Sequence, residues 1–156
     1  MSDLPLRMAE SNDAEAIATL VNAAFRIERF FIEGDRTNPD QVRALLQTGN
    51  FLLVEEDGRP TACVYVERRG ERGYFGLLAV DPGRQRSGWG TRLIVAAEDY
   101  CRASGCSVME LQTVNLRTEL PSFYQRLGYS ETGTAPFPAE AQPKQPCHFV
   151  KMSKSL

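Results

Sequence analysis

The most informative segment of the sequence is Ala79-Val80-Asp81-Pro82-Gly83-Arg84-Gln85-Arg86-Ser87-Gly88-Trp89-Gly90-Thr91. A strand-like apolar run ends here, Asp81-Pro82-Gly83 turns the chain, and Gly88 and Gly90 open a helical pattern. Glycine has no Cβ, so backbone N–H groups can approach a ligand closely, and a helix N-terminus favours an anion. The segment therefore indicates a phosphate site at a strand–helix junction, to which Arg84 and Arg86 would add charge-assisted contacts.

Two common phosphate-binding loops do not match this segment. The third glycine of the dinucleotide fingerprint is missing after Gly88 and Gly90, and there is no Gly-Lys-Ser/Thr sequence for a nucleoside triphosphate. Glycines at a strand–helix turn also occur for structural reasons alone. On this segment alone, an anion site and a purely structural turn stay equally open.

Upstream of this segment, the sequence has the pattern of an antiparallel meander. The expected strands are Phe51–Glu55, Thr61–Glu67 and Arg72–Val80. Asp57-Gly58 is a hairpin signal between the first two, and Arg69-Gly70 marks the next turn.

Two amphipathic helices are expected before the meander. Asn12 is the expected N-cap of the first, with Glu15 completing a capping box. Its apolar stripe is Ile17, Leu20, Val21, Ala24 and Phe25. The second helix begins at Asn38-Pro39, with Gly49 closing it.

Downstream, helices and strands alternate. A helix is expected from Gly88 to about Ser104, a strand over Ser107–Val114 and a short helix over Glu119–Leu127. Two strands follow, near Tyr129–Thr134 and Cys147–Met152. The order α-α-β-β-β-α-β-α-β-β predicts an α+β fold, a mixed sheet with helices on its faces, in one domain over residues 1–156.

Composition narrows the class of protein. The chain has 156 residues, 42% of them apolar, and a net charge of -2, so no region is basic enough to indicate nucleic-acid binding. Neither the apolar core of a signal peptide nor a run of about 20 apolar residues occurs, so we expect a cytoplasmic protein that does not bind membranes. The only histidine is His148, and the cysteines have no zinc-site spacing, so we expect free thiols and no metal. These cysteines are Cys63, Cys101, Cys106 and Cys147.

Two motifs together resemble a known family. Val80-Asp81-Pro82 followed by Gln85-x-x-Gly88-x-Gly90 is similar to the acetyl-coenzyme A motif of the GNAT superfamily of N-acetyltransferases. The later stretch Ser122-Phe123-Tyr124-Gln125-Arg126-Leu127-Gly128-Tyr129 is similar to the family's second motif. Both occur in the family's order, and the resemblance covers nearly the whole chain. It implies the GNAT fold, a central sheet of about six to seven strands that splays in the middle, with helices on both faces.

The resemblance also implies how acetyl-coenzyme A, the acyl donor, is bound. The backbone of Leu78, Ala79 and Val80 would pair with pantetheine, and an N–H near Leu78 would polarise the thioester oxygen. Plain core packing of these side chains is compatible with that role. The remaining residues implied in cofactor binding are Gln85, Arg86, Ser87, Gly88, Trp89, Gly90, Thr91 and Asn115.

The sequence departs from the family pattern at two places. Arg86 stands where many members have glycine. Asn115 lies nine residues before Tyr124, where the family often has an asparagine about seven residues before the tyrosine, so the segment Leu116–Pro121 looks slightly longer.

Tyr124 is the expected catalytic residue. When an amine attacks the thioester directly, the departing thiolate needs a proton, and a tyrosine hydroxyl within reach of the sulfur supplies it. The alternative is that Tyr124 only packs in the core. Phe123 and Leu127 share the core-facing side of this helix, and Tyr124 is turned by about 100° from them.

The acceptor site is less well defined. The family builds it from the connections that correspond here to residues 26–36 and 135–146, and we expect Phe31, Glu33 and Glu110 to bind the substrate. The amine must lose a proton before attack, since an alkyl ammonium has a pKa of about 10.4. The strand Tyr74–Val80 has no carboxylate, so Glu110, Glu33 and His148 are the candidate bases.

The charged residues of the first connection, residues 26–36, suit two different chemical groups of an acceptor. Glu28, Glu33 and Asp35 suit an amine, whereas Arg29 and Arg36 suit a carboxylate. The expected activity is acetyl transfer to a primary amine of a small molecule or peptide. The alternatives are a catalytically silent acyl-coenzyme A sensor and a protein-interaction module, and a homodimer is expected only by analogy with the family.

Overall fold

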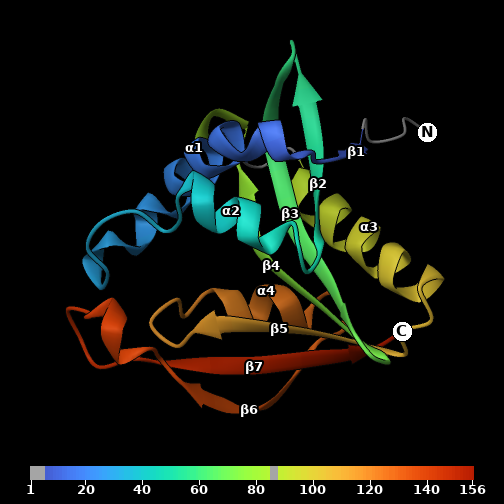
Figure 1. Cartoon of the computed structure of the whole chain (residues 1–156). Coiled ribbons are helices and arrows are strands. Elements are labelled where there is room, and N and C mark those ends of the chain that lie inside the picture. Colours follow the sequence, from blue (N-terminus) through green and yellow to red (C-terminus); the bar gives the residue numbers. More distant parts are fainter. Residues whose placement is uncertain (1–5, 85–87) are drawn as a thin grey trace.

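The computed structural model describes residues 6–84 and 88–156, and its centre is a seven-stranded sheet in the order β1-β2-β3-β4-β5-β7-β6 (Figure 1). The strands are β1 (Leu6–Met8), β2 (Asn50–Glu56), β3 (Arg59–Arg69), β4 (Arg72–Val80), β5 (Val108–Val114), β6 (Ser130–Pro136) and β7 (His148–Ser155). The α-helices are α1 (Ala14–Ala24), α2 (Pro39–Leu45), α3 (Trp89–Ala103) and α4 (Leu120–Gln125). Short 3₁₀ helices are η1 (Ser11–Asp13), η2 (Phe25–Phe30), η3 (Pro82–Arg84) and η4 (Ala139–Ala141). Only β4 and β5 run parallel among these neighbours, which confirms the predicted mixed sheet and α+β class.

The meander β2–β3–β4 forms as its turn residues predict. Asp57 and Gly58 both have positive φ, 51° and 78°, and they join Glu56 to its cross-strand partner Arg59. Two consecutive residues with positive φ make the tight turn whose twist matches a two-stranded ribbon. The prediction of an Asp-Gly hairpin is therefore confirmed.

Strands β4 and β5 splay apart, and this positions the site. They pair only over Arg72–Tyr74 and Val108–Glu110, although β4 continues to Val80 and β5 to Val114. Figure 1 shows the two strands diverging from their common end like the arms of a V. The predicted splay in the middle of the sheet is confirmed.

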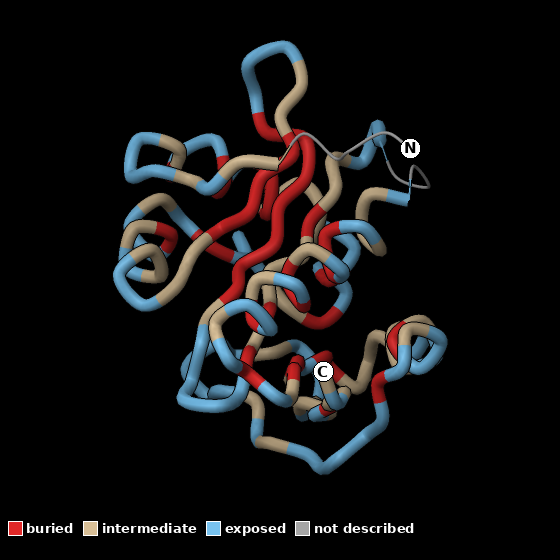
Figure 2. Tube along the Cα trace, turned by 90° about the vertical axis from the view of Figure 1, so that its right-hand side faces the viewer, coloured by how far each residue is buried: buried red, intermediate tan, exposed pale blue. Residues whose placement is uncertain are grey.

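Helices cover both faces of the sheet and give two hydrophobic cores. Alternate residues of β2 serve them: Phe51 and Leu53 pack with α1 and α2, whereas Leu52 and Val54 pack with α3 and α4. This period of two is what a strand buried on both faces requires. Figure 2 shows the central strands as the most continuously buried part of the chain. None of the helices in the described parts of the chain is long and apolar enough to cross a membrane.

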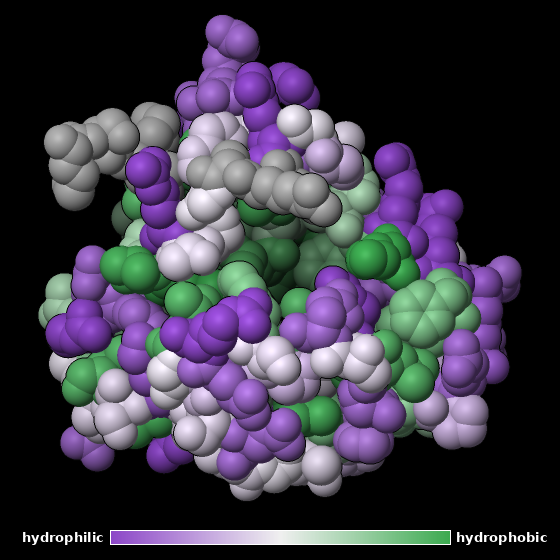
Figure 3. Space-filling view, turned by 180° about the vertical axis from the view of Figure 1, so that it is seen from behind, coloured by the Kyte–Doolittle hydropathy of each residue, from purple (hydrophilic) through white to green (hydrophobic). Residues whose placement is uncertain are grey.

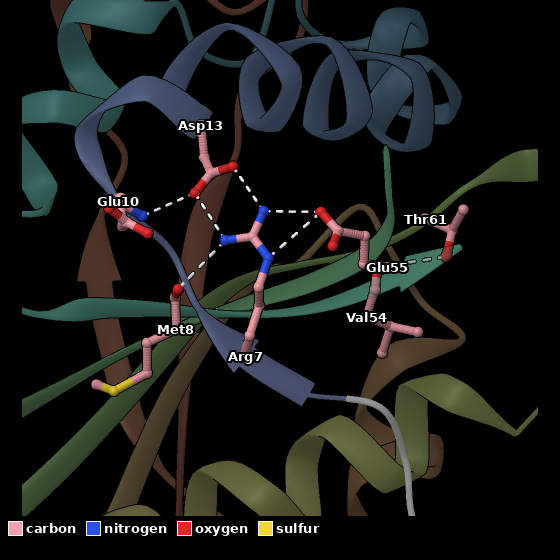
Figure 4. A network of polar contacts seen from close by, with 7 residues as sticks. All are labelled: Arg7, Met8, Glu10, Asp13, Val54, Glu55 and Thr61. Carbon is pink, nitrogen blue, oxygen red and sulfur yellow. Dashed lines mark hydrogen bonds and ion pairs between the residues drawn. The ribbon is translucent and has the colours of Figure 1, made fainter. Parts of the chain in front are cut away.

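The N-terminal region differs from the prediction. Strand β1 was not expected, and Asn12 is not the N-cap of α1: it lies inside η1, while Glu10 and Asp13 form the capping box. Figure 4 shows why Asp13 is held there. The guanidinium of Arg7 donates to both oxygens of Asp13, at 2.9 and 2.8 Å, and to Glu55 at 2.8 Å. Hydrogen bonding to Arg7 lowers the pKa of Asp13, so the network is favoured at neutral pH and weakens as the carboxylates are protonated.

The second helix begins as predicted. The side chain of Asn38 accepts a hydrogen bond from the backbone N–H of Gln41 at 2.9 Å, and Pro39 occupies the first turn. Gly49 has a different role from the predicted helix stop, because α2 ends at Leu45. A Cβ at Gly49 would lie 2.5 Å from the carbonyl oxygen of Val66, so this glycine allows close approach to β3.

Candidate functional site

A cavity of ≈ 490 Å³ fills the gap between β4 and β5. Residues 74–78 of β4 and 111–114 of β5 line it, and consecutive residues of a strand point to opposite faces. The cavity therefore passes through the sheet. Helix α4 borders it on the α3 side, and η2 with the segment that follows borders it on the α1 side. Figure 3, seen from the side away from α1 and α2, shows a hollow with hydrophobic side chains at its bottom.

Tyr124 projects from α4 into this cavity and is also packed in the core. It is 7% exposed, with ring contacts to Phe75, Phe123 and Tyr129 at centroid distances of 6.0, 5.1 and 6.1 Å. Tyr129 is itself fixed, because its hydroxyl donates to the buried carboxylate of Glu98 at 2.7 Å. Burial raises the pKa of Tyr124 to about 12, so its hydroxyl is protonated at neutral pH. A proton donor thus lines the gap in a fixed orientation.

A bulge in β4 shapes the other wall. Tyr65 pairs with Gly76 and Cys63 pairs with Ala79, so Leu77 and Leu78 together stand opposite one residue of β3. Leu77 has a φ of 48°, which is unusual for a residue with a side chain. Strand β5 no longer pairs with β4 beyond Tyr74, so backbone groups on that edge of β4 face the gap.

The predicted pantetheine residues lie at this bulge and just after it. Leu78 lines the cavity. Ala79 is 1% exposed and packs in the α1 core, and Val80 packs against the α3 core. The two side chains thus serve packing, and the backbone of both residues pairs with β3 on one edge of β4.

The predicted phosphate-binding turn is described in part. Gln85, Arg86 and Ser87 lie outside the described residues. Gly88 precedes the first turn of α3 with a φ of 82°, and no atom lies within 4 Å of a Cβ placed at Gly88 or Gly90. Among the described residues, a Cβ at either glycine would therefore lie in open space, and the N-terminus of a helix such as α3 favours an anion.

The residues around these glycines have different surroundings. Trp89 and Thr91 are half-buried in the first turn of α3, and Trp89 packs against the core on that face of the sheet. The side chain of Arg84 forms an ion pair with Glu56 at 2.9 Å instead of standing free for a phosphate.

Asn115 lies outside the cavity lining. Its side-chain oxygen accepts a hydrogen bond from the backbone N–H of His148 at 2.8 Å, and its own N–H donates to the His148 carbonyl at 2.9 Å. These bonds fasten the end of β5 to the start of β7. His148, a candidate base, is exposed and also lies outside the lining.

Only one of the three expected substrate residues lines the cavity. Glu33 does so with an 84% exposed side chain, 3.9 Å from Lys144. Phe31 is fully buried, with Phe30 edge-on against it at 4.8 Å. Glu110 forms a hydrogen bond with Arg72 at 2.8 Å and lies outside the lining. The structure brings Glu33 to the site and leaves Phe31 and Glu110 away from it.

The cavity contains an ion pair that the sequence analysis missed. Glu28 of η2 is 8% exposed, and one of its carboxylate oxygens lies 2.8 Å from a guanidinium nitrogen of Arg117. Arg117 comes from the segment before α4 and also contacts Glu119 at 2.9 Å. Burial raises the pKa of Glu28, although the attraction of Arg117 opposes the effect.

A signal for Glu28 was present in the sequence. Ile17, Val21 and Ala24 form the apolar stripe of α1, and the same spacing continues to residue 28. The pattern thus places a carboxylate on an inward-facing side of the helix. Nothing comparable points to Arg117, whose position depends on the fold.

In the described part of the chain, no group of three or more acidic, histidine or cysteine side chains is placed to hold a metal ion.

Comparison with known proteins agrees with this architecture. The sequence matches the model of the acetyltransferase (GNAT) family over residues 14–129. The ribosomal-protein-S18-alanine N-acetyltransferase of Escherichia coli is 15% identical, with a TM-score of 0.74 over 96% of this chain and 92% of that one. Ard1 of Thermoplasma volcanium is 16% identical, with a TM-score of 0.76 over 97% and 96%.

A third similar structure contains a ligand. It is yncA of Salmonella typhimurium, a proposed acetyltransferase determined with its cofactor acetyl-CoA, which is 22% identical with a TM-score of 0.74 over 99% of this chain and 95% of that one. These structural similarities show a shared fold, and the family match covers more than half of the sequence. The chain belongs to the GNAT family of acetyltransferases.

Proposed function

We propose that this protein transfers the acetyl group of acetyl-coenzyme A to a primary amine by direct attack, with Tyr124 as the general acid. The observation that carries the proposal is the cavity through the sheet, which Tyr124 lines from α4 and Glu28 lines from η2. A donor and an acceptor entering from opposite faces would meet in this gap. A protonated group on one side and a carboxylate on the other suit a reaction in which one proton is supplied and another removed.

The residues present fit acetyl-coenzyme A. The open space at Gly88 and Gly90, beside the N-terminus of α3, suits a pyrophosphate. The edge of β4 beyond Tyr74 offers backbone groups to the pantetheine amides, and Leu78, Leu111 and Phe123 give an apolar lining. The acetyl-CoA complex of yncA supports the same donor here.

Glu28 is the base that the geometry favours over Glu33, Glu110 and His148. It is the buried carboxylate of the cavity, and burial raises its pKa, which strengthens it as a proton acceptor. The ion pair with Arg117, at 2.8 Å, fixes the carboxylate in place. In this proposal Glu28 takes the ammonium proton of the acceptor, and Tyr124 gives its hydroxyl proton to the departing thiolate.

Calorimetric titration with acetyl-coenzyme A tests the donor site. We expect the parent to bind and Gly88→Asp to lose affinity by a factor of about 10² or more, since the new carboxylate would face the pyrophosphate. Gly88→Asn is the matched control, because asparagine tolerates positive φ and adds no charge. No binding to the parent at saturating acetyl-coenzyme A would contradict the proposal.

Glu28→Gln is expected to lower kcat by a factor of about 10 to 10², with acetyl-coenzyme A affinity unchanged, because the amide keeps the shape but cannot take a proton. Steady-state rates and calorimetry on the same preparation separate the two quantities. Since the change leaves Arg117 with Glu119 as its one remaining carboxylate partner among the described residues, a melting curve must show a folded variant. A fully active Glu28→Gln variant would exclude Glu28 as the base.

A further inference from the structure

The charged residues at the acceptor side of the cavity are nearly all paired. Arg29 lies 3.5 Å from Asp35, Lys144 lies 3.9 Å from Glu33, and Arg117 lies 2.8 Å from Glu28. These pairs resolve most of the conflicting charge in the sequence of the 26–36 connection. Arg36 belongs to none of these three pairs.

Arg36 lines the cavity and differs from the other cations there. The ion pairs found in residues 6–84 and 88–156 do not include it. Its guanidinium carbon lies 5.6 Å from the centre of the Phe25 ring, another lining residue. An aromatic face holds the planar fork of an arginine while leaving its N–H groups available to a carboxylate.

The charge of Arg36 reaches into the cavity. Burial raises the pKa of Glu28 and the pKa of Tyr74. The positive charge of Arg36 opposes this rise in pKa at both groups. Both residues line the same space. The guanidinium is therefore within electrostatic range of the carboxylate that we assign as the base.

The remaining wall on this side is mostly apolar. Phe137 and Phe149 lie with ring centres 5.1 Å apart and line the cavity from the β6 and β7 end of the sheet. Ile32, Pro138 and Ala141 complete this surface. A ligand here would meet the buried carboxylate of Glu28, the guanidinium of Arg36 and a hydrophobic wall. The other charged lining residues, Glu33, Asp35 and Arg117, each lie in an ion pair.

We infer that the acceptor is a small amine that also carries a carboxylate and an apolar group, as hydrophobic amino acids do. Arg36 binds the carboxylate, Glu28 faces the ammonium, and Phe137 with Phe149 packs against the apolar part. A polyamine fits less well, since its second cation would meet Arg36. An internal lysine of a protein brings no carboxylate of its own. This inference rests on the proposed acetyl transfer.

The test compares matched acceptors. Each standard L-amino acid is paired with the amine left by its decarboxylation, for example L-phenylalanine with 2-phenylethylamine. Release of the free thiol of coenzyme A gives kcat/KM for both. For the best hydrophobic pair we expect the amino acid to be favoured about tenfold or more, because a charge-assisted bidentate contact is lost with the carboxylate.

Variants assign the preference to Arg36. Arg36→Gln should bring the ratio of the two kcat/KM values close to one, mainly because KM of the amino acid rises. Arg36→Lys should keep part of the preference for the amino acid. Arg29→Gln is the matched control, because Arg29 lies in the same connection, pairs with Asp35 and does not line the cavity. Its ratio should equal that of the parent.

The outcomes separate this inference from the proposed function. If amines are acetylated and the carboxylate makes no difference, or if Arg36→Gln keeps the full preference, the inference is wrong while acetyl transfer stands. If no amine is acetylated by protein that binds acetyl-coenzyme A, the proposed function fails and the inference fails with it.

Discussion

Replacing Tyr124 with Phe is expected to lower kcat by a factor of about 10² or more, while the Kd for acetyl-coenzyme A changes by less than about twofold. The substitution removes only the hydroxyl. The ring keeps its contacts with Phe75, Phe123 and Tyr129, so α4 should stay in place. Steady-state kinetics and calorimetry on one preparation measure the two effects separately.

The pH dependence adds a second check on Tyr124. A general acid must be protonated to act, and burial raises the pKa of Tyr124 to about 12. The parent should therefore show no alkaline loss of kcat from this group below about pH 10 to 11. A loss with an apparent pKa near 8, absent in Tyr124→Phe, would contradict the assigned environment.

A matched tyrosine controls for the loss of a hydroxyl in general. Tyr100 lies on α3, accepts a hydrogen bond from the side chain of Asn50 at 2.7 Å and is not part of the cavity lining. Tyr100→Phe should leave kcat within about twofold of the parent. If Tyr124→Phe behaves in the same way, Tyr124 is not the acid and serves only the packing that the structure shows.

Local sequence signals predicted the parts of the fold that depend on neighbouring residues. Strand β4 begins at Arg72 and ends at Val80 as predicted, because a glycine turn precedes it and Asp81-Pro82 follows it. Strand β1 was missed because three residues are too few for a periodic pattern. Its place is set by pairing with β2, more than 40 residues away, which no local signal encodes.

The residues of the candidate site also fall into two groups: those in contiguous sequence motifs, and those that only the folded chain brings together. Tyr124 and the turn at Gly88 belong to contiguous motifs, so they could be found in the sequence. The pair Glu28 and Arg117 joins residues 89 positions apart, and only the folded chain brings them together. Phe31 was an expected substrate residue because it lies among charged neighbours, but tertiary packing buries it.

Gly73→Ala is expected to lower the free energy of unfolding by about 2 to 3 kcal/mol, the cost of overpacking a dense core. A Cβ at Gly73 would lie 2.5 Å from Sγ and 2.9 Å from Cβ of Cys101, and 3.2 Å from Sδ of Met109. Both neighbours are fully buried. Because the Cβ of Cys101 is fixed to the backbone of α3, changing a rotamer does not relieve the clash, and the helix must move away from β4. Urea denaturation measures the loss.

This glycine links packing to function, since it lies in the three-residue stretch where β4 still pairs with β5, at the narrow end of the splay. Moving α3 there would tilt the helix whose first turn flanks the proposed pyrophosphate site, so the affinity for acetyl-coenzyme A should also fall. Gly133→Ala in β6 is the control, because no atom lies within 4 Å of the added Cβ and its φ is not positive. That variant should stay within about 0.5 kcal/mol of the parent. Equal stability of the two variants would mean that α3 absorbs the methyl group freely and that its distance from β4 is not set by Gly73.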